Sequence, residues 1–127
     1  MLKKKRLRVL IVDDDPDPAG GLAELVGMNG HDARVAHDGR SAIRWMRNDD
    51  FQLVLLDIGL PDMDGYEVAR RLTLLGERSI SIVALTESSS NEDLLRSDGA
   101  GLDAHIVKPC RSDQLAVILE KAMARTA

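Results

Sequence analysis

The chain is poor in cysteine, in aromatic residues and in long apolar runs, and each shortage excludes a class of protein. Cys110 is the only cysteine among the 127 residues, so the chain has neither an intramolecular disulfide nor a cluster of thiolate metal ligands. A chain without disulfides suits a reducing compartment, and we expect a cytoplasmic protein. With an aromatic content of 2%, the core must be built from aliphatic side chains.

Membrane and nucleic-acid signals are also scarce. No apolar run approaches the ~18 residues of a membrane span, and the amino end lacks the apolar segment of a signal peptide, so we expect neither membrane insertion nor secretion. The net charge is −4, and we expect no direct contact with nucleic acid. The basic residues of segment 1–6 predict a solvated tail, with a phosphate or membrane contact as the alternative.

Short apolar runs alternate with segments of helical period, which is the pattern of β-α units wound into a parallel sheet. We count five units, and they suit a single domain over residues 1–127. The strands are expected at residues 7–13, 32–36, 53–56, 80–85 and 104–107. The predicted fold is therefore an α/β doubly wound sheet without a second domain.

The helices are expected between and after these strands. The last helix begins at residue 111 or 112, and its apolar residues fall at helical spacing: Leu115, Ile118, Leu119, Ala122 and Met123. The third covers residues 66–75, and Gly76 is placed to end it. The first contains Gly20 and Gly21, each unfavourable by about 1 kcal/mol in a helix interior. The fourth, near residues 91–97, has few apolar residues to anchor it.

Four of the apolar runs end in polar residues. The first ends at Asp13 and Asp14, the third at Asp57, the fourth at Thr86 and the fifth at Lys108. Because the carboxyl ends of parallel strands lie at one edge of a sheet, we expect these side chains to meet there. The sequence therefore predicts a site at this edge.

The three aspartates point to a metal. As anions they would repel one another by several kcal/mol at ~4 Å unless a cation lay between them. Oxygen ligation with retained water is typical of Mg²⁺, or of Mn²⁺ in its place. Such a site supports phosphoryl transfer, with Lys108 as a second positive group and Asp57 as the nucleophile that forms an acyl phosphate.

Other nearby acids have simpler explanations. Asp15 is better explained as the first residue of a helix than as a third metal ligand. Asp62 and Asp64 lie in the glycine-rich loop after Asp57, and we interpret them as turn formers rather than ligands.

This arrangement resembles the receiver domain of two-component response regulators, and the resemblance covers almost the whole chain. The chain carries that family's acidic pair, phosphoacceptor, switch hydroxyl and lysine-proline pair, at Asp13, Asp14, Asp57, Thr86, Lys108 and Pro109. The resemblance implies a flavodoxin-like fold, with a five-stranded parallel sheet in the order 2-1-3-4-5 and five helices.

The resemblance also implies how the site works. Asp14, Asp57 and the backbone carbonyl of Gly59 would bind Mg²⁺, with Asp13 acting through water. The bond between Lys108 and Pro109 would be cis. A sensor histidine kinase or a phosphotransfer protein would donate the phosphoryl group. The domain would catalyse its own phosphorylation and dephosphorylation, and would not be a turnover enzyme.

The implied output is a shift between two populated conformations. The charge on phosphorylated Asp57 would draw Thr86 and Lys108 inward and shift the face formed by the fourth helix, fifth strand and fifth helix. An unidentified downstream partner, or a second copy in a homodimer, would bind that face. The domain would act alone, relay the phosphoryl group, or form part of a hybrid kinase.

Two residues depart from the family pattern. His105 stands at the position of a switch tyrosine or phenylalanine; its titration would make signalling sensitive to pH, and a partly exposed strand residue is the simpler alternative. Glu87 stands where a small residue usually gives access to the phosphoryl group, so we expect it to repel anionic donors.

Two other classes of function stay open at this point. A pseudo-receiver would use the same fold as a phosphorylation-independent binding or dimerisation module; His105 and Glu87 favour it, and the complete set of acids, hydroxyl and lysine disfavours it. A phosphohydrolase of the haloacid dehalogenase type would use Asp13 and Asp15 as its Asp-x-Asp pair. That family's following Gly-Thr is replaced here by Pro16-Asp17, and there is no cap domain.

Overall fold

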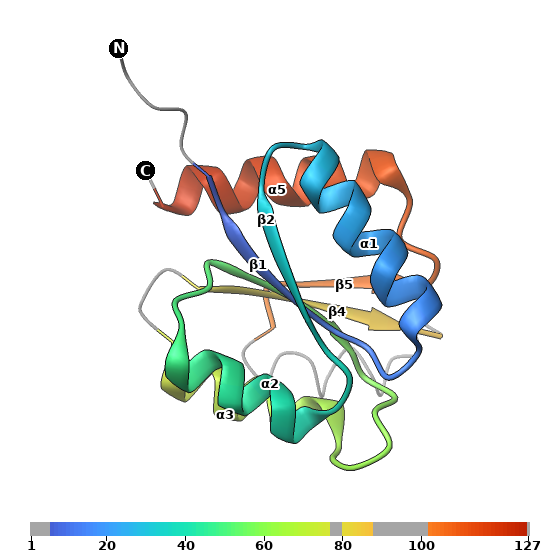
Figure 1. Cartoon of the computed structure of the whole chain (residues 1–127), viewed down its shortest axis with the longest axis vertical. Helices are drawn as coiled ribbons and strands as arrows, with labels where there is room; N and C mark the ends of the chain where they lie inside the picture. Colours follow the sequence, from blue (N-terminus) through green and yellow to red (C-terminus); the bar gives the residue numbers. More distant parts are fainter. Residues whose placement is uncertain (1–5, 77–79, 88–101, 127) are drawn as a thin grey trace.

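The five strands lie side by side in one parallel sheet, with helices on both faces (Figure 1). The computed structural model describes residues 6–76, 80–87 and 102–126. The strands are β1 (Arg8–Val12), β2 (Asp32–Ala36), β3 (Leu53–Asp57), β4 (Ser81–Thr86) and β5 (Ala104–Val107). Their order, β2-β1-β3-β4-β5, confirms the predicted doubly wound, flavodoxin-like α/β fold.

Three strands have bounds that differ slightly from the prediction. β1 begins at Arg8 and ends at Val12, although the Asp13 amide still donates to Ala36 O at 3.0 Å. β3 ends one residue later than predicted, and β4 both begins and ends one residue later, at Ser81 and Thr86. The ladder explains this, because Asp57 lies opposite Leu85 and Thr86 lies opposite Val107. Polar residues at the strand ends are therefore held by the sheet itself.

The helices of the described residues are α1 (Pro16–Met28), α2 (Gly39–Asn48), α3 (Gly65–Leu75) and α5 (Ser112–Thr126). α3 ends at the predicted glycine, where the Gly76 amide donates to Leu72 O at 2.8 Å. α5 starts at one of the two predicted residues. The predicted fourth helix, near residues 91–97, lies outside the described part of the chain.

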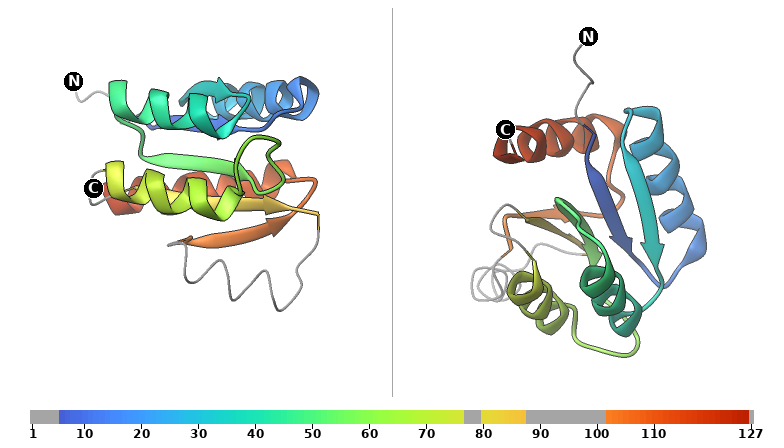
Figure 2. Two further views of the ribbon diagram at one scale, coloured as in Figure 1. Left: turned by 90° about the horizontal axis from the view of Figure 1, so that it is seen from below. Right: turned by 60° about the vertical axis from the view of Figure 1, so that its left-hand side comes forward.

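The helices form one layer on each face of the sheet. α2 and α3 cover one face, and α1 and α5 cover the other (Figures 1 and 2). β3 alternates between the layers: Val54 and Leu56 pack toward α2 and α3, and Leu53 and Leu55 toward α1 and α5. A strand covered on both faces needs an uninterrupted apolar sequence, which the run at residues 53–56 supplies.

The predicted basic tail is described only at its last residue. Arg6 is exposed, and its guanidinium lies 3.5 Å from the Asp32 carboxylate; residues 1–5 lie outside the described chain. Within the described residues, no helix combines the length and the apolar character needed to cross a membrane.

Candidate functional site

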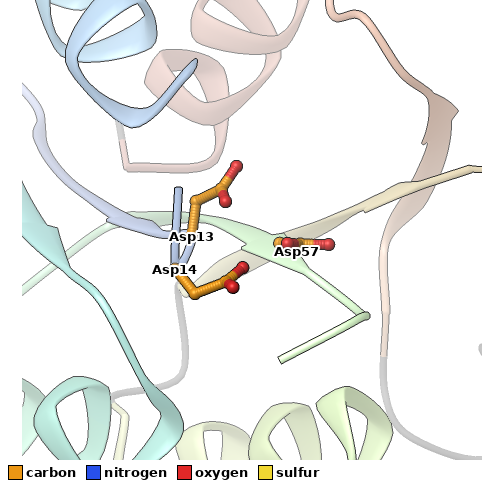
Figure 3. Close-up of side chains that lie close together, drawn as sticks. All are labelled: Asp13, Asp14 and Asp57. Atoms are coloured by element: carbon orange, nitrogen blue, oxygen red, sulfur yellow. The ribbon is translucent and has the colours of Figure 1, made fainter. Parts of the chain in front are cut away.

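Three aspartates meet at the carboxyl edge of the sheet (Figure 3). Asp13 and Asp14 follow β1, and Asp57 ends the neighbouring strand β3. One carboxylate oxygen from each lies within 4.8 Å of the others. Asp13 and Asp57 are buried, whereas Asp14 is exposed. The structure therefore brings together the three acids that the strand ends predicted.

Lys108 brings a positive charge to this cluster from the end of β5. Its Nζ lies 3.0 Å from Asp57 Oδ1 and 3.9 Å from Asp13 Oδ2. Its backbone amide donates to Thr86 O at 2.7 Å, so the residue after β5 is tied to the end of β4. The peptide bond between Lys108 and Pro109 is cis.

Burial dominates the electrostatics of Asp13. Burial raises the pKa of its carboxyl group, and the charges of Asp57 and Asp14 raise it further, against the lowering effects of the Asp15 amide and Lys108. Burial alone would lower the pKa of Lys108, but its hydrogen bond to Asp57 and the nearby acids raise it overall. The cluster therefore contains the carboxyl groups of Asp13, Asp14 and Asp57 and one ammonium group, that of Lys108, and it keeps an excess of negative charge.

This donor set fits a hard divalent cation. All three groups offer carboxylate oxygen, and neither histidine nor cysteine belongs to the cluster within the described residues. Such a set matches the preference of Mg²⁺, and also of Mn²⁺, for oxygen ligands. Gly59, whose backbone carbonyl was expected to bind the metal beside Asp14 and Asp57, lines the same pocket, and its amide donates to Asp57 Oδ1 at 3.0 Å.

The cluster opens into a pocket of about 580 Å³. Thr86 is buried at one side of it, as expected for the residue that ends β4. Glu87 stands at the mouth: its side chain is 88% exposed, and Oε1 lies 3.8 Å from Lys108 Nζ.

Tyr66, in the first turn of α3, also lines the pocket and was not predicted. Tyr66 comes nine residues after Asp57, and nothing in the sequence around it indicates that its side chain lies at the site.

His105 does not line this pocket. It lies on β5 opposite Ala84 of β4. Its ring Nε2 is buried and has no hydrogen-bond partner within the described chain. A buried nitrogen without a partner costs free energy. The residue as a whole is half-buried, as a partly exposed strand residue would be.

The remaining acids have structural roles. The Asp15 carboxylate caps α1 by accepting from the Asp17 amide at 3.1 Å. This confirms that Asp15 is a helix-start residue, as predicted. Asp64 caps α3. Asp62 does more than form a turn: its two carboxylate oxygens accept from Gly39 N at 2.9 Å and Arg40 N at 3.2 Å. The loop after Asp57 is thereby attached to the first turn of α2.

One loop glycine is required by packing, and the other is not. A Cβ at position 65 would lie 2.5 Å from Ile58 Cα, a separation that side chains essentially never adopt. A Cβ at position 59 would meet only Asp57 Oδ1, at an ordinary 3.7 Å. Gly65 therefore lets α3 begin close against the backbone that follows Asp57.

Comparison with known proteins gives consistent matches. The family model of the response regulator receiver domain matches residues 9–120. A gliding motility regulatory protein of Myxococcus xanthus is 39% identical over 105 residues, which are 82% of this chain and 14% of that protein. The response regulator MprA of Mycolicibacterium vanbaalenii is 32% identical over 120 residues, 94% of this chain and 52% of that protein.

Solved structures agree with these sequence matches. The crystal structure of a CheY-like response regulator receiver domain protein from Methanospirillum hungatei JF-1 superposes with a TM-score of 0.88 and 31% identity, over 96% of this chain and 98% of that one. This chain spans only part of the length of these relatives: 14% of the gliding motility regulatory protein and 52% of MprA.

Proposed function

The chain belongs to the response regulator receiver domain family, and from that membership we propose that it accepts a phosphoryl group on Asp57 in a two-component system or phosphorelay. Receiver domains are signalling modules rather than turnover enzymes. The observation that carries the proposal is the position of Asp57: it lies in a cluster of three carboxylates, with Lys108 Nζ 3.0 Å from its Oδ1.

The two oxygens of Asp57 are held differently, which favours this residue as the nucleophile. The Gly59 amide and the Lys108 ammonium both bind Oδ1. Within the described chain no hydrogen-bond donor reaches Oδ2, so this oxygen can attack phosphorus. The Oδ2–P bond would form as the bond between phosphorus and the leaving atom of the donor breaks. Asp13 likewise accepts from the amide two residues later, but it is only 1% exposed, against 5% for Asp57, and Lys108 Nζ lies 3.9 Å from it rather than 3.0 Å.

We propose Mg²⁺, or Mn²⁺ in its place, as the cofactor, bound by Asp14, Asp57 and the Gly59 carbonyl, with Asp13 acting through water. The bound ion would neutralise charge that spreads over the phosphoryl oxygens in the transition state. Lys108 supplies a positive charge from the β5 side of the same pocket.

The output would pass through the end of β5. A phosphoryl group on Asp57 adds a charge of about −1.5 to −2 next to the Lys108 ammonium. Because the Lys108 amide is bonded to Thr86 O, a movement of either residue is transmitted to both strand ends. We propose that the surface around β5 and α5 then binds a downstream partner or a second copy of the chain. The phosphoryl donor would be a sensor histidine kinase or a phosphotransfer protein, and the domain itself would act in the cytoplasm.

A second candidate is a pseudo-receiver that binds its partner without phosphorylation. Glu87 favours it, because this carboxylate already lies 3.8 Å from Lys108, at the mouth of the pocket where a phosphoryl group would be bound. His105, in place of an aromatic switch residue, points the same way.

Metal-dependent phosphorylation separates the two candidates. The protein would be incubated with Mg²⁺ and acetyl phosphate and its intact mass recorded, beside Asp57→Asn, a chelated sample, and Asp50→Asn as an exposed acid outside the pocket. A receiver gains one phosphoryl group, and loses that gain in Asp57→Asn and on chelation. If no group is added at a donor concentration that modifies a known receiver, the pseudo-receiver is favoured.

A further inference from the structure

A groove between α2 and α3 is lined by arginines from both helices. It has a volume of about 410 Å³, and its lining residues are Arg40, Ile43, Arg44, Arg47, Met63 and Arg71. The three arginines of α2 recur at i, i+4 and i+7, so they share one exposed face of the helix. α2 and α3 lie next to each other on one face of the sheet (Figures 1 and 2). This groove shares no residue with the pocket of Asp57.

The arginines of α2 differ from most others in the described chain. Four others are each paired with a carboxylate: Arg6 with Asp32, Arg8 with Asp49, Arg111 with Asp113, and Arg125 with Asp103. Arg34 of β2 instead donates to the backbone carbonyl of Ala33. Arg70 and Arg71 of α3 share the single carboxylate of Glu67.

Within the described residues, the guanidinium groups of Arg40, Arg44 and Arg47 lie within ion-pair or hydrogen-bond distance of no acceptor, although the charges of Arg44 and Arg40 help to lower the pKa of Asp38 at the start of α2. Like charges at i, i+4 on a helix are unfavourable, so this face carries a cost to stability. Arg71 adds a further positive charge on the opposite side of the groove. Its only carboxylate partner in the described chain, Glu67, is shared with Arg70, so this charge is only partly neutralised. The groove is therefore a concentration of positive charge on a chain whose net charge is −4.

The floor of the groove is apolar. Ile43 of α2 is buried and Met63, in the loop before α3, is half-buried. Methionine adapts its shape to different contacts, and the stems of the arginines add further apolar surface. The groove is therefore suited to a ligand that presents both negative charge and an apolar group, rather than to a free inorganic anion.

Acidic residues lie at both ends of the basic stretch. Asp38 caps α2 and Asp62 binds its first turn, whereas Asp49 and Asp50 follow its last turn. The stretch from Arg40 to Arg47 is about 10 Å long at the rise of an α-helix. A duplex nucleic acid or a flat anionic membrane extends much further and would bring its phosphates against these acids. The charge pattern favours a short anionic segment.

We propose that the groove between α2 and α3 binds a short acidic segment of a partner protein. Its carboxylates would pair with Arg40, Arg44, Arg47 and Arg71, and an apolar side chain between them would contact Ile43 and Met63. The interaction does not require phosphorylation of Asp57, so it stands independently of the function proposed above. It would give the domain a second docking surface, separate from that of β5 and α5.

The test is an NMR titration of the full chain, labelled with ¹⁵N, against a helical peptide with glutamates on one face around a central leucine. A matched peptide carries glutamine in place of each glutamate. We expect saturable shifts confined to α2, α3 and the loop containing Met63, and weaker binding as salt is raised. The Arg44→Glu, Arg47→Glu double variant should bind about tenfold more weakly, as loss of two surface ion pairs predicts.

Two controls separate a specific groove from general attraction. Lys121→Glu, a single charge reversal on the exposed surface of α5, should leave binding unchanged. Arg44→Gln with Arg47→Gln removes the charges without introducing repulsion, and should also weaken binding. The proposal is overturned if the glutamine peptide binds equally well, if no saturable shift appears, or if the double variants bind like the unmodified protein. Tighter binding at this groove by duplex DNA or phosphatidylserine vesicles would overturn it as well.

Discussion

The ammonium nitrogen of Lys108 lies 3.0 Å from Oδ1 of Asp57, although the two residues come from strands that are not neighbours. β4 separates β3 from β5, and the lysine side chain crosses the end of β4 to reach the aspartate. The same nitrogen lies 3.9 Å from Asp13 Oδ2, so one cation serves two buried carboxylates. The charged groups of the site are thus already assembled within the fold.

Removal of the lysine should strengthen metal binding. Lys108→Met takes away a positive charge that lies beside two of the acids proposed to interact with Mg²⁺, and we expect the affinity for Mg²⁺ to rise about tenfold. Isothermal titration calorimetry measures this directly. Lys121→Met, on the exposed surface of α5, serves as the control and should leave the affinity unchanged. An unchanged or weaker affinity in Lys108→Met would show that the ammonium does not compete with the ion.

Glu87 should slow the reaction with anionic donors. Its carboxylate stands at the mouth of the pocket, 3.8 Å from Lys108 Nζ. Removing that charge in Glu87→Ala should raise the rate of phosphorylation by acetyl phosphate roughly fivefold, which corresponds to about 1 kcal/mol of repulsion. Glu87→Gln keeps the size and should give most of the same gain. Equal rates in all three proteins, measured by intact mass over time, would rule out an electrostatic barrier.

Gly65 and Gly20 should respond in opposite ways to alanine. At position 65 the new Cβ would lie 2.5 Å from Ile58 Cα and 2.6 Å from Ile58 O, and backbone cannot yield cheaply. We expect Gly65→Ala to lower the free energy of unfolding by about 2–3 kcal/mol. A Cβ at position 20 would have no atom within 4 Å, so Gly20→Ala should raise that free energy by about 0.5–1 kcal/mol. Urea denaturation measures both, and a neutral Gly65→Ala would contradict the packing described.

The cap of α2 should make a pH-dependent contribution to stability. The Ser41 amide donates to Asp38 Oδ1 at 2.7 Å, and this bond is the largest of the effects that hold the pKa of Asp38 below its usual range. A lowered pKa means that the folded state favours the charged carboxylate. The stabilisation is therefore present above the unfolded pKa and disappears as pH falls through the folded value.

We expect Asp38→Ala to lower the free energy of unfolding by about 1 kcal/mol at pH 7. Its difference from the unmodified protein should shrink below about pH 4. Urea denaturation across this range provides the measurement, with Asp50→Ala as the matched control at an exposed acid. A difference that stays constant with pH would mean that the charge of Asp38 does not stabilise the helix.

The fold and the acidic cluster could be predicted because their signals are local. Each apolar run and the polar residue that ends it are adjacent in the sequence, and parallel strands put all such ends at one edge of the sheet. The first helix forms despite two glycines because both lie exposed on α1, where they displace no packing, and Asp15 caps its first turn.

The parts that escaped prediction depend on contacts between distant residues. Asp62 binds amides 22 and 23 residues earlier in the chain, so its turn-like sequence context concealed its role at α2. Arg71 joins the arginines of α2 only because α2 and α3 pack together, whereas the contiguous basic residues of the sequence lie at its amino end. The inclusion of Asp57 and Thr86 in their strands likewise depends on hydrogen bonds to neighbouring strands rather than on apolar character.

The most direct measurement is to locate the phosphoryl group among the three clustered aspartates. The protein would be treated with acetyl phosphate and Mg²⁺ and then reduced with borohydride, which converts a phosphorylated aspartate to homoserine. Peptide mass spectrometry then locates the modified residue. We predict homoserine at Asp57 alone, and only when Mg²⁺ is present. Homoserine at Asp13 or Asp14, or at none of the three, would contradict the role proposed for Asp57.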